Sequence, residues 1–261
     1  MTLDGELWIN TGSPVKQEIG DCMIHYHGTP IGGTTNDKAR VLAGRHALVP
    51  FPRQDDMGIV ADVCQSFVFD NGAFSAWKRG LVMDVAGYIE WVEKWHRHPG
   101  FDWALIPDVI DGDEQANDEL IAAWPKHLHG VPVWHMHESL ERLRQLCEEW
   151  TIVALGSSGQ WATPGTESWW KRMGDAMDFI CDGGRPPCKL HGLRMLDPAI
   201  FSRLPLSSAD STNAAVNCGS ISRFGSYVPP TAGQRAEVIV ARIEAHNSAA
   251  IWESSGQAEL L

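Results

Sequence analysis

The sequence contains six cysteines but no pair of them in CxxC spacing. Structural zinc sites are commonly built from such closely spaced pairs, so a structural zinc is not expected. The first ten residues are polar and acidic, which is unlike the basic and then apolar start of a secretory signal. We therefore expect a cytoplasmic protein with reduced thiols, and we predict no cofactor.

Long apolar runs and an excess of basic residues are also missing. No stretch approaches the ~18 consecutive apolar residues that a membrane helix needs, so no membrane partner is expected. The 21 Lys and Arg are outnumbered by 33 Asp and Glu, and the formal net charge is -12. This charge argues against a broadly basic nucleic-acid surface, although a few local cations are enough to face a phosphate.

No internal repeat or low-complexity linker divides the 261 residues, which suits one domain over 1–261 with 1–20 as a peripheral arm. Short apolar runs alternate with segments of helical period, as in a parallel-sheet protein. The count of predicted strands is close to eight, so the predicted fold class is α/β, a single TIM-type (β/α)8 barrel. The predicted strands are Cys22–His27, His46–Pro50, Ser66–Asp70, Trp103–Pro107, Val131–His135, Thr151–Leu155, Lys189–Met195 and Leu206–Ala209. The predicted helices are Val85–Arg97, Gln115–Trp124, Ser139–Glu149, Trp169–Cys181 and Ala232–Asn247, with loops at Asp182–Pro187 and Gly219–Gln234.

Polar residues follow nearly every predicted strand at its carboxyl end. Asp70 ends the third strand, Asp108 follows the fourth, and Asp210 follows the last. In a barrel these ends converge on one face, where active sites are built. An aspartate that begins such a loop can also serve only as a helix cap, so the prediction of a site depends on their combination in one chain.

Two of these strand ends resemble motifs of the tRNA-guanine transglycosylases. The segment Asp70-Asn71-Gly72-Ala73-Phe74-Ser75 resembles the family's Asp-Ser-Gly-Gly-Phe-Gln. The segment 208–217, which reads SADSTNAAVN, resembles the family's nucleophile segment. Pro107-Asp108 falls where the family has its base-recognising Asp, and the segments 154–157 and 189–193 fall where it has two further strands. The order of motifs matches over roughly 24–217, which is most of the chain.

The chain also departs from these motifs. The tRNA enzymes carry a Cys-x-Cys-x-x-Cys and His zinc site after the nucleophile, and Cys218 alone stands there in this sequence. Ala73, Ser75 and Ala215 replace a Gly, a Gln and an Arg of the family's motifs. We therefore expect a barrel without the zinc subdomain, most similar to the DpdA-type DNA 7-deazaguanine transglycosylases of phages and bacteria.

The resemblance implies a glycosyltransferase that replaces guanine in nucleic acid, DNA more than tRNA, with a 7-deazaguanine base of the preQ0 type. Barrels of this family are often dimers, so the resemblance leaves a homodimer open. It implies that Asp210 is the nucleophile that holds the sugar covalently and that Asp70 is the general acid and base. Asp108 would accept hydrogen bonds from the guanine edge, and the Gly156 backbone would approach the base closely. The other expected substrate contacts are Ser157, Trp134, Phe74, His191 and Asn71, and the expected phosphate contacts are Arg194, Arg203 and Arg223.

Two other interpretations stay open at this point. Several histidines occur as His-x-His pairs, and such pairs on a strand point to one face. A metal centre of an amidohydrolase-like barrel is one alternative, with His25, His27, His137, His191 and Asp210 as its ligands. The other is a barrel that binds a nucleotide or a partner without catalysis, against which the presence of both Asp70 and Asp210 argues.

Overall fold

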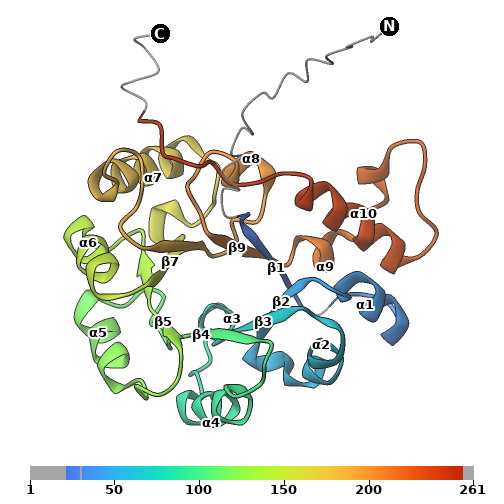
Figure 1. Cartoon of the computed structure of the whole chain (residues 1–261), viewed down its shortest axis with the longest axis horizontal. Coiled ribbons are helices and arrows are strands. Elements are labelled where there is room, and N and C mark those ends of the chain that lie inside the picture. The colour runs from blue at the N-terminus through green and yellow to red at the C-terminus, as the bar shows by residue number, and fades with distance from the viewer. Residues whose placement is uncertain (1–21, 30, 255–261) are drawn as a thin grey trace, which may run out of the picture.

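A computed structural model describes residues 22–29 and 31–254, so the predicted arm at 1–20 lies outside the described residues. Within them, nine strands form one parallel sheet in the order β5-β4-β3-β2-β1-β9-β8-β7-β6 (Figure 1). The strands are β1 (Ile24–Gly28), β2 (His46–Pro50), β3 (Ser66–Asp70), β4 (Phe101–Leu105), β5 (Gly130–Val131), β6 (Val133–His135), β7 (Ile152–Gly156), β8 (Lys189–Gly192) and β9 (Ser208–Ser211).

The two strands at the ends of this order are neighbours in the chain, separated by Pro132 alone. β5 pairs with β4, and β6 pairs with β7, so the sheet curls into a nearly closed barrel. A proline has no N–H to donate, which interrupts the strand at this point. Its carbonyl still accepts a hydrogen bond from the Ala154 amide. The predicted α/β architecture is confirmed as a TIM-like parallel barrel.

The five helices predicted from periodicity correspond to α4 (Val85–Trp95), α5 (Glu114–Ala123), α6 (Leu140–Glu149), α7 (Glu167–Ile180) and α10 (Ala232–Glu244). The remaining helices have no counterpart in the prediction: α1 (Thr35–Leu42), α2 (Met57–Val63), α3 (Ala73–Lys78), α8 (Pro198–Phe201) and α9 (Asn213–Asn217). The single-turn segments are η1 (Phe51–Asp56), η2 (Gly159–Trp161) and η3 (Ile221–Phe224), and η3 lies in the segment predicted as a loop. Helices of one or two turns are too short to show a clear apolar period.

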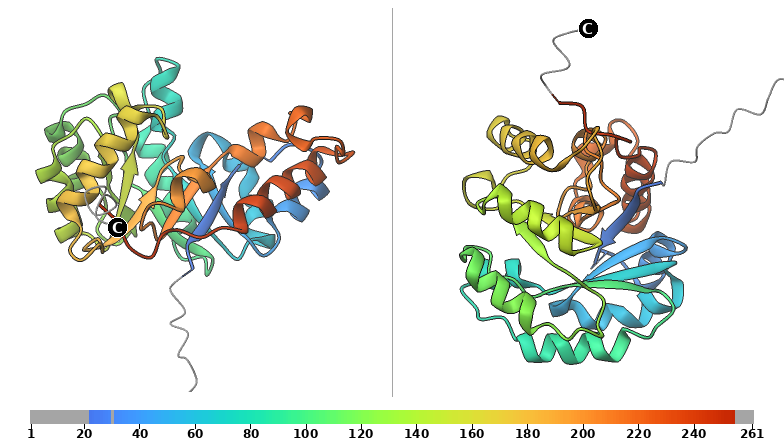
Figure 2. Two further views of the ribbon diagram at one scale, coloured as in Figure 1. Left: turned by 90° about the horizontal axis from the view of Figure 1, so that it is seen from above. Right: turned by 60° about the vertical axis from the view of Figure 1, so that its left-hand side comes forward.

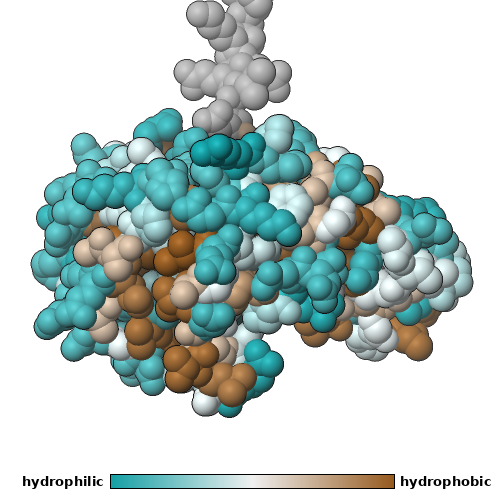
Figure 3. All heavy atoms as spheres, turned by 90° about the horizontal axis from the view of Figure 1, so that it is seen from below, coloured by the Kyte–Doolittle hydropathy of each residue, from teal (hydrophilic) through white to brown (hydrophobic). Residues whose placement is uncertain are grey.

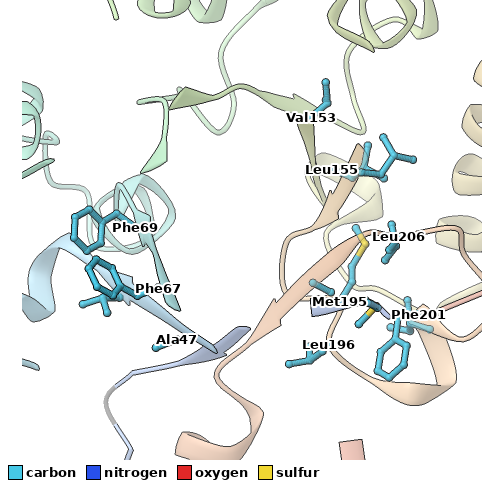
Figure 4. Close-up of a cluster of buried hydrophobic side chains, with 14 of the residues drawn as sticks. Ala47, Phe67, Phe69, Val153, Leu155, Met195, Leu196, Phe201 and Leu206 are labelled. Carbon is cyan, nitrogen blue, oxygen red and sulfur yellow. The ribbon is translucent and has the colours of Figure 1, made fainter. Parts of the chain in front are cut away.

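Side chains alternate between two cores along each strand, because successive residues of a strand point to opposite faces. Phe67 and Phe69 of β3 pack outward in the larger core, which lies between the strands and the helices (Figure 4). Val68 of the same strand belongs to a smaller cluster of buried residues. That cluster fills the barrel interior with Tyr26, Leu48, Val68, Trp103, Leu105, Val131, Val133 and Ala154. Inward-pointing residues at the carboxyl ends of the strands therefore lie at one end of this apolar cluster.

The loops that follow the strands build the carboxyl-terminal face of the barrel. α3 projects from this face beyond the ends of the strands, as the left view in Figure 2 shows in teal. At the right of the same view, in orange to red, lies the segment that follows β9 and contains α9 and η3. None of the helices in the described part of the chain has the length and apolar character to span a membrane.

Candidate active site

Three aspartates predicted from the strand ends lie on the carboxyl-terminal face. Asp70 is the last residue of β3 and shares the inward face with Val68. Asp210 lies in β9, where Ala209 packs into the outer core and Asp210 therefore points inward. Asp108 follows β4 by three residues. The charges of Asp108 and Asp210 both act on Asp70, so the three carboxylates form one electrostatic group.

Asp70 sits where its charged form is disfavoured. Burial raises the pKa of Asp70 to about 7, and the nearby charges of Asp210 and Asp108 also raise it. The Gly72 amide opposes this effect by donating a 2.8 Å hydrogen bond to Asp70 Oδ1, and the Arg194 charge opposes it as well. At neutral pH, Asp70 therefore exists in both protonated and ionised forms, which suits a group that gives and takes a proton.

The turn after β3 fixes the two polar residues beside Asp70. Gly72 has a φ of +78°, and a Cβ on it would lie 2.8 Å from Pro52 Cδ, so this position requires glycine. The side chain of Asn71 is buried: its oxygen accepts from the Ala73 amide, and its nitrogen donates to the Ile106 carbonyl. Asn71 thus ties the loop after β3 to the end of β4.

Asp108 is oriented by neighbours on both of its oxygens. Asn71 Nδ2 donates to Asp108 Oδ1 at 2.7 Å, and His135 Nε2 lies 2.9 Å from Asp108 Oδ2, within ion-pair distance. A Cβ on Gly156 would lie 3.0 Å from His135 Nδ1, so the glycine leaves room for the imidazole. Each carboxylate oxygen has two lone pairs. Asp108 can therefore keep these contacts and still accept hydrogen bonds from a ligand.

Asp210 is buried and held from two sides. The Arg194 amide donates a 3.0 Å hydrogen bond to Asp210 Oδ1, and His191 Nε2 lies 3.3 Å from the same atom. His191 is fully buried, and its other ring nitrogen lies 2.8 Å from Ser208 Oγ. Because His191 contacts Asp210 and has no exposed surface, it is not placed to touch a substrate as expected.

Arg194 connects the carboxylates to α3. Its φ of 57° places it in the left-handed region, which non-glycine residues seldom adopt. The guanidinium lies 4.1 Å from the centre of the Phe74 ring, and Nη2 donates to the Ser157 carbonyl at 3.3 Å. Burial lowers the pKa of Arg194, whereas the charges of Asp210 and Asp70 raise it. The hydroxyl of Ser157 accepts from Trp169 Nε1, and its carbonyl accepts from Arg194.

A cavity of about 500 Å³ shares Asn71 with this site, but none of the three aspartates lines it. It lies between η1 and the segment that joins α3 to α4, and Asn71 and Gly72 form the wall nearest to Asp70. Phe51, Pro52 and Met83 supply apolar surface, and Arg79 supplies a cation. The volume falls in the range of small-ligand pockets, and a planar base is a ligand of suitable size.

Two residues expected at the site lie elsewhere. Trp134 points outward from β6, is fully buried in the outer core, and donates from Nε1 to the Ser139 carbonyl. It therefore has no face open for stacking. Arg203 lies in the turn between α8 and β9, at the opposite end of the barrel, with its guanidinium 4.1 Å from the ring of Trp170. The third expected phosphate contact, Arg223, is exposed in η3 on the carboxyl-terminal side.

The histidines of the metal alternative do not converge. His25 and His27 point out of the barrel. His25 Nε2 lies 3.1 Å from the His246 carbonyl oxygen, and His27 Nε2 lies 3.0 Å from Glu244 Oε1. His137 is exposed and lies 2.7 Å from Ser158 Oγ. Within residues 22–29 and 31–254, no group of three His, Cys, Asp or Glu side chains is arranged to hold a metal ion. The ligand set of that alternative is therefore not assembled.

One residue of the site was not singled out from the sequence. His135 lies within reach of Asp108, and in the sequence it belongs to the His-x-His pair His135-Met136-His137. A usable signal is present: Val133 and His135 occupy alternate positions of one short strand, so they face the same side, and Val133 is apolar. A polar residue in the last inward position of a barrel strand is a site candidate by the same argument that selects Asp70.

The chain matches none of the models of known protein families and none of the curated proteins with which it was compared. The function proposed below therefore depends on the geometry of the site and on the motifs in the sequence.

Replacing Asp70 with Asn should stabilise the protein at alkaline pH. The pKa of Asp70 is about 7 in the folded chain and ~3.9 for an unfolded aspartate, so the folded state binds more protons between these values. The protonated Asp70 carboxyl makes its whole contribution to the free energy of unfolding below pH ~4, and this contribution is lost as the pH rises to about 7. We expect Asp70→Asn to raise the Tm by a few degrees at pH 8 and less at pH 5, measured by calorimetry. The matched variant Asp111→Asn, on an exposed residue of the same face, should leave the Tm unchanged, and a lower Tm for Asp70→Asn at pH 8 would contradict the assignment.

Proposed function

We propose that this protein is a base-exchange transglycosylase that replaces guanine in nucleic acid with a 7-deazaguanine base. The observation that supports this most directly is the pairing of Asp210, whose carboxylate accepts from the Arg194 amide, with Asp70, whose pKa lies at about 7. Two carboxyl groups in different environments can divide the work of nucleophile and proton carrier. Asp108, oriented by Asn71 and His135, faces the same region and suits recognition of the guanine edge.

The proposed reaction has two steps at the sugar carbon C1′. In the first, the Asp210 carboxylate attacks C1′, the bond from C1′ to the guanine nitrogen breaks, and the departing base takes the proton of Asp70. An ester then joins the sugar to Asp210. In the second, the ionised Asp70 removes a proton from the ring nitrogen of the incoming 7-deazaguanine. That nitrogen attacks C1′ and releases Asp210, so the protonation state of Asp70 is restored at the end of the cycle.

DNA is the polymer that we favour. After Asp210 the sequence contains one cysteine, Cys218, and so lacks the cysteine cluster with which the tRNA enzymes hold zinc. A buried Cys218, whose thiol contacts the Ala215 carbonyl, is part of the packing around α9. The bound nucleotide would have to leave any base stack to reach the carboxylates.

The test is incubation of the protein with single-stranded DNA, duplex DNA or tRNA, together with labelled guanine or 7-cyano-7-deazaguanine. We expect label to enter one polymer, with a rate that does not change when a chelator is added. Incorporation into tRNA alone would reverse the choice of polymer. No incorporation into any polymer, together with ligand binding that Asp70→Asn and Asp210→Asn leave unchanged, would support a binding protein without catalysis instead.

A further inference from the structure

Exposed apolar side chains are concentrated on the carboxyl-terminal face. Of the eight large hydrophobic side chains that are exposed in the described residues, seven lie between a strand and the main helix that follows it. The exception is Ile251, beyond α10. In Figure 3, hydrophobic residues gather on a projecting part of the surface at the edge opposite the grey atoms. The seven are Trp77, Leu81, Val82, Val109, Val216, Ile221 and Tyr227.

Trp77 is connected to the carboxylates through a short series of contacts. The Arg194 amide is bonded to Asp210, the Arg194 guanidinium covers the Phe74 ring, and the Phe74 ring centre lies 5.8 Å from that of Trp77. Trp77 lies on α3, which projects from the face, and 47% of its surface is exposed. The exposed part of the indole offers a flat apolar surface on the same face of the barrel as the carboxylates.

Two cations follow Trp77 directly. Lys78 and Arg79 are exposed at the end of α3, and Arg79 Nε donates to the Ser75 carbonyl. The lysines and arginines that form ion pairs in the described part of the chain are Lys38, Arg40, Arg45, Arg53, Arg142 and Lys171. Lys78 and Arg79 are not among them, so their charges are available to a phosphate backbone in a protein whose net charge is -12.

We propose that Trp77, Lys78 and Arg79 form a docking strip for an unpaired segment of nucleic acid. Trp77 stacks on a base that flanks the reacting nucleotide, and the two cations contact the adjacent phosphates. In a duplex the faces of the bases are covered by their neighbours, whereas an exposed aromatic side chain binds the open face of an unpaired base. A strongly acidic protein with a short cationic segment also suits few phosphate contacts better than the wide footprint of a duplex. The inference rests on the proposed function, because it places the strand by the position of Asp210.

The strip is tested by binding alone, without turnover. Fluorescence anisotropy would compare a labelled single-stranded DNA that contains guanine, the same sequence as a duplex, and the single-stranded RNA of the same sequence. We expect tighter binding of single strands than of the duplex, and the DNA and RNA arms identify which polymer is preferred. Trp77→Ala should weaken binding of the preferred strand about tenfold, and Trp77→Phe should retain most of it.

The charge contribution has a matched control. Lys78→Gln should reduce the slope of log affinity against log salt concentration by about 0.7, the value for one phosphate contact of a single strand. Lys171→Gln removes an exposed lysine of α7 and should leave the slope unchanged. Melting temperatures of Lys78→Gln and Lys171→Gln should match the wild type, because both lysines are exposed. If Trp77→Ala is poorly folded, Trp77→Phe and Lys78→Gln still decide the result.

Two results would overturn the docking strip: binding of the duplex as tight as that of the single strands, or less than a twofold effect of Trp77→Ala in a folded protein. Failure of the proposed function gives a different pattern, namely no base exchange while binding of single strands still depends on Trp77. Base exchange with binding that is indifferent to Trp77 and Lys78 would leave the proposed function intact and reject the strip alone.

Discussion

Asp210→Asn is expected to reduce the rate of base exchange about a thousandfold or more, because the amide cannot attack C1′ and form the glycosyl ester. Asparagine has nearly the same shape and keeps an oxygen that can accept from the Arg194 amide, so the fold around β9 should persist. The measurement is a single-turnover assay of guanine release combined with mass spectrometry of the protein. Wild-type protein should show the mass of a covalent adduct with the nucleic acid, and the variant should show none.

The matched control is Asp113→Asn. Asp113 caps α5 on the same side of the barrel by accepting from the Ala116 amide, and asparagine caps a helix about as well as aspartate. This variant should retain the full rate of exchange. A rate for Asp210→Asn within tenfold of the wild type would show that Asp210 is not the nucleophile.

Asp70→Asn is expected to slow base exchange by about two to four orders of magnitude, the usual contribution of a general acid or base. It should also remove a pH dependence. Because the pKa of Asp70 is about 7, its protonated form is lost as the pH rises through neutrality. The first step needs that proton, so single-turnover guanine release by wild-type protein should fall between pH 6 and pH 8.5, flanking the pKa of about 7.

The variant should show a flat profile over the same range, measured with the same substrate. A fall in rate that persists unchanged in Asp70→Asn would assign the titration to another group. The stability change expected for this variant adds an independent check: a protein that becomes more stable at pH 8 while it loses activity has lost a functional group and not its fold.

Much of the barrel could be predicted because its strands are marked locally. His46–Pro50 and Ser66–Asp70 were predicted with the observed bounds, since both are short apolar segments that turns interrupt on each side. β4 spans Phe101–Leu105 instead of the predicted Trp103–Pro107, and its pairing with β3 is irregular between Phe67 and Val68. That irregularity is set by the neighbouring strand, so β4 by itself carries no sign of it.

The positions of Asp70 and Asp108 at strand ends can also be predicted, because each follows an apolar run directly. Asp210 follows Ser207-Ser208-Ala209 and lies inside β9, whereas the sequence predicts it just after the strand. The predictions that were wrong concern which side chains point into the barrel and which point outward. Trp134 and His27 are near strand ends as well, yet one packs into the outer core and the other faces Glu244. A barrel strand is buried on both faces, so neither face is marked as polar, and the pattern does not say which residues point inward.

The sequence by itself determined an α/β chain with aspartates at the carboxyl ends of its strands, because apolar runs and turn residues act locally. Only the tertiary structure decided which of the polar residues meet. Closure of the barrel through β5 and β6 brought Asp70 and Asp210 into one electrostatic group, placed His135 against Asp108, and turned His25 and His27 outward. The raised pKa of Asp70 is also decided by the tertiary structure, because burial and the charges of residues distant in sequence produce it.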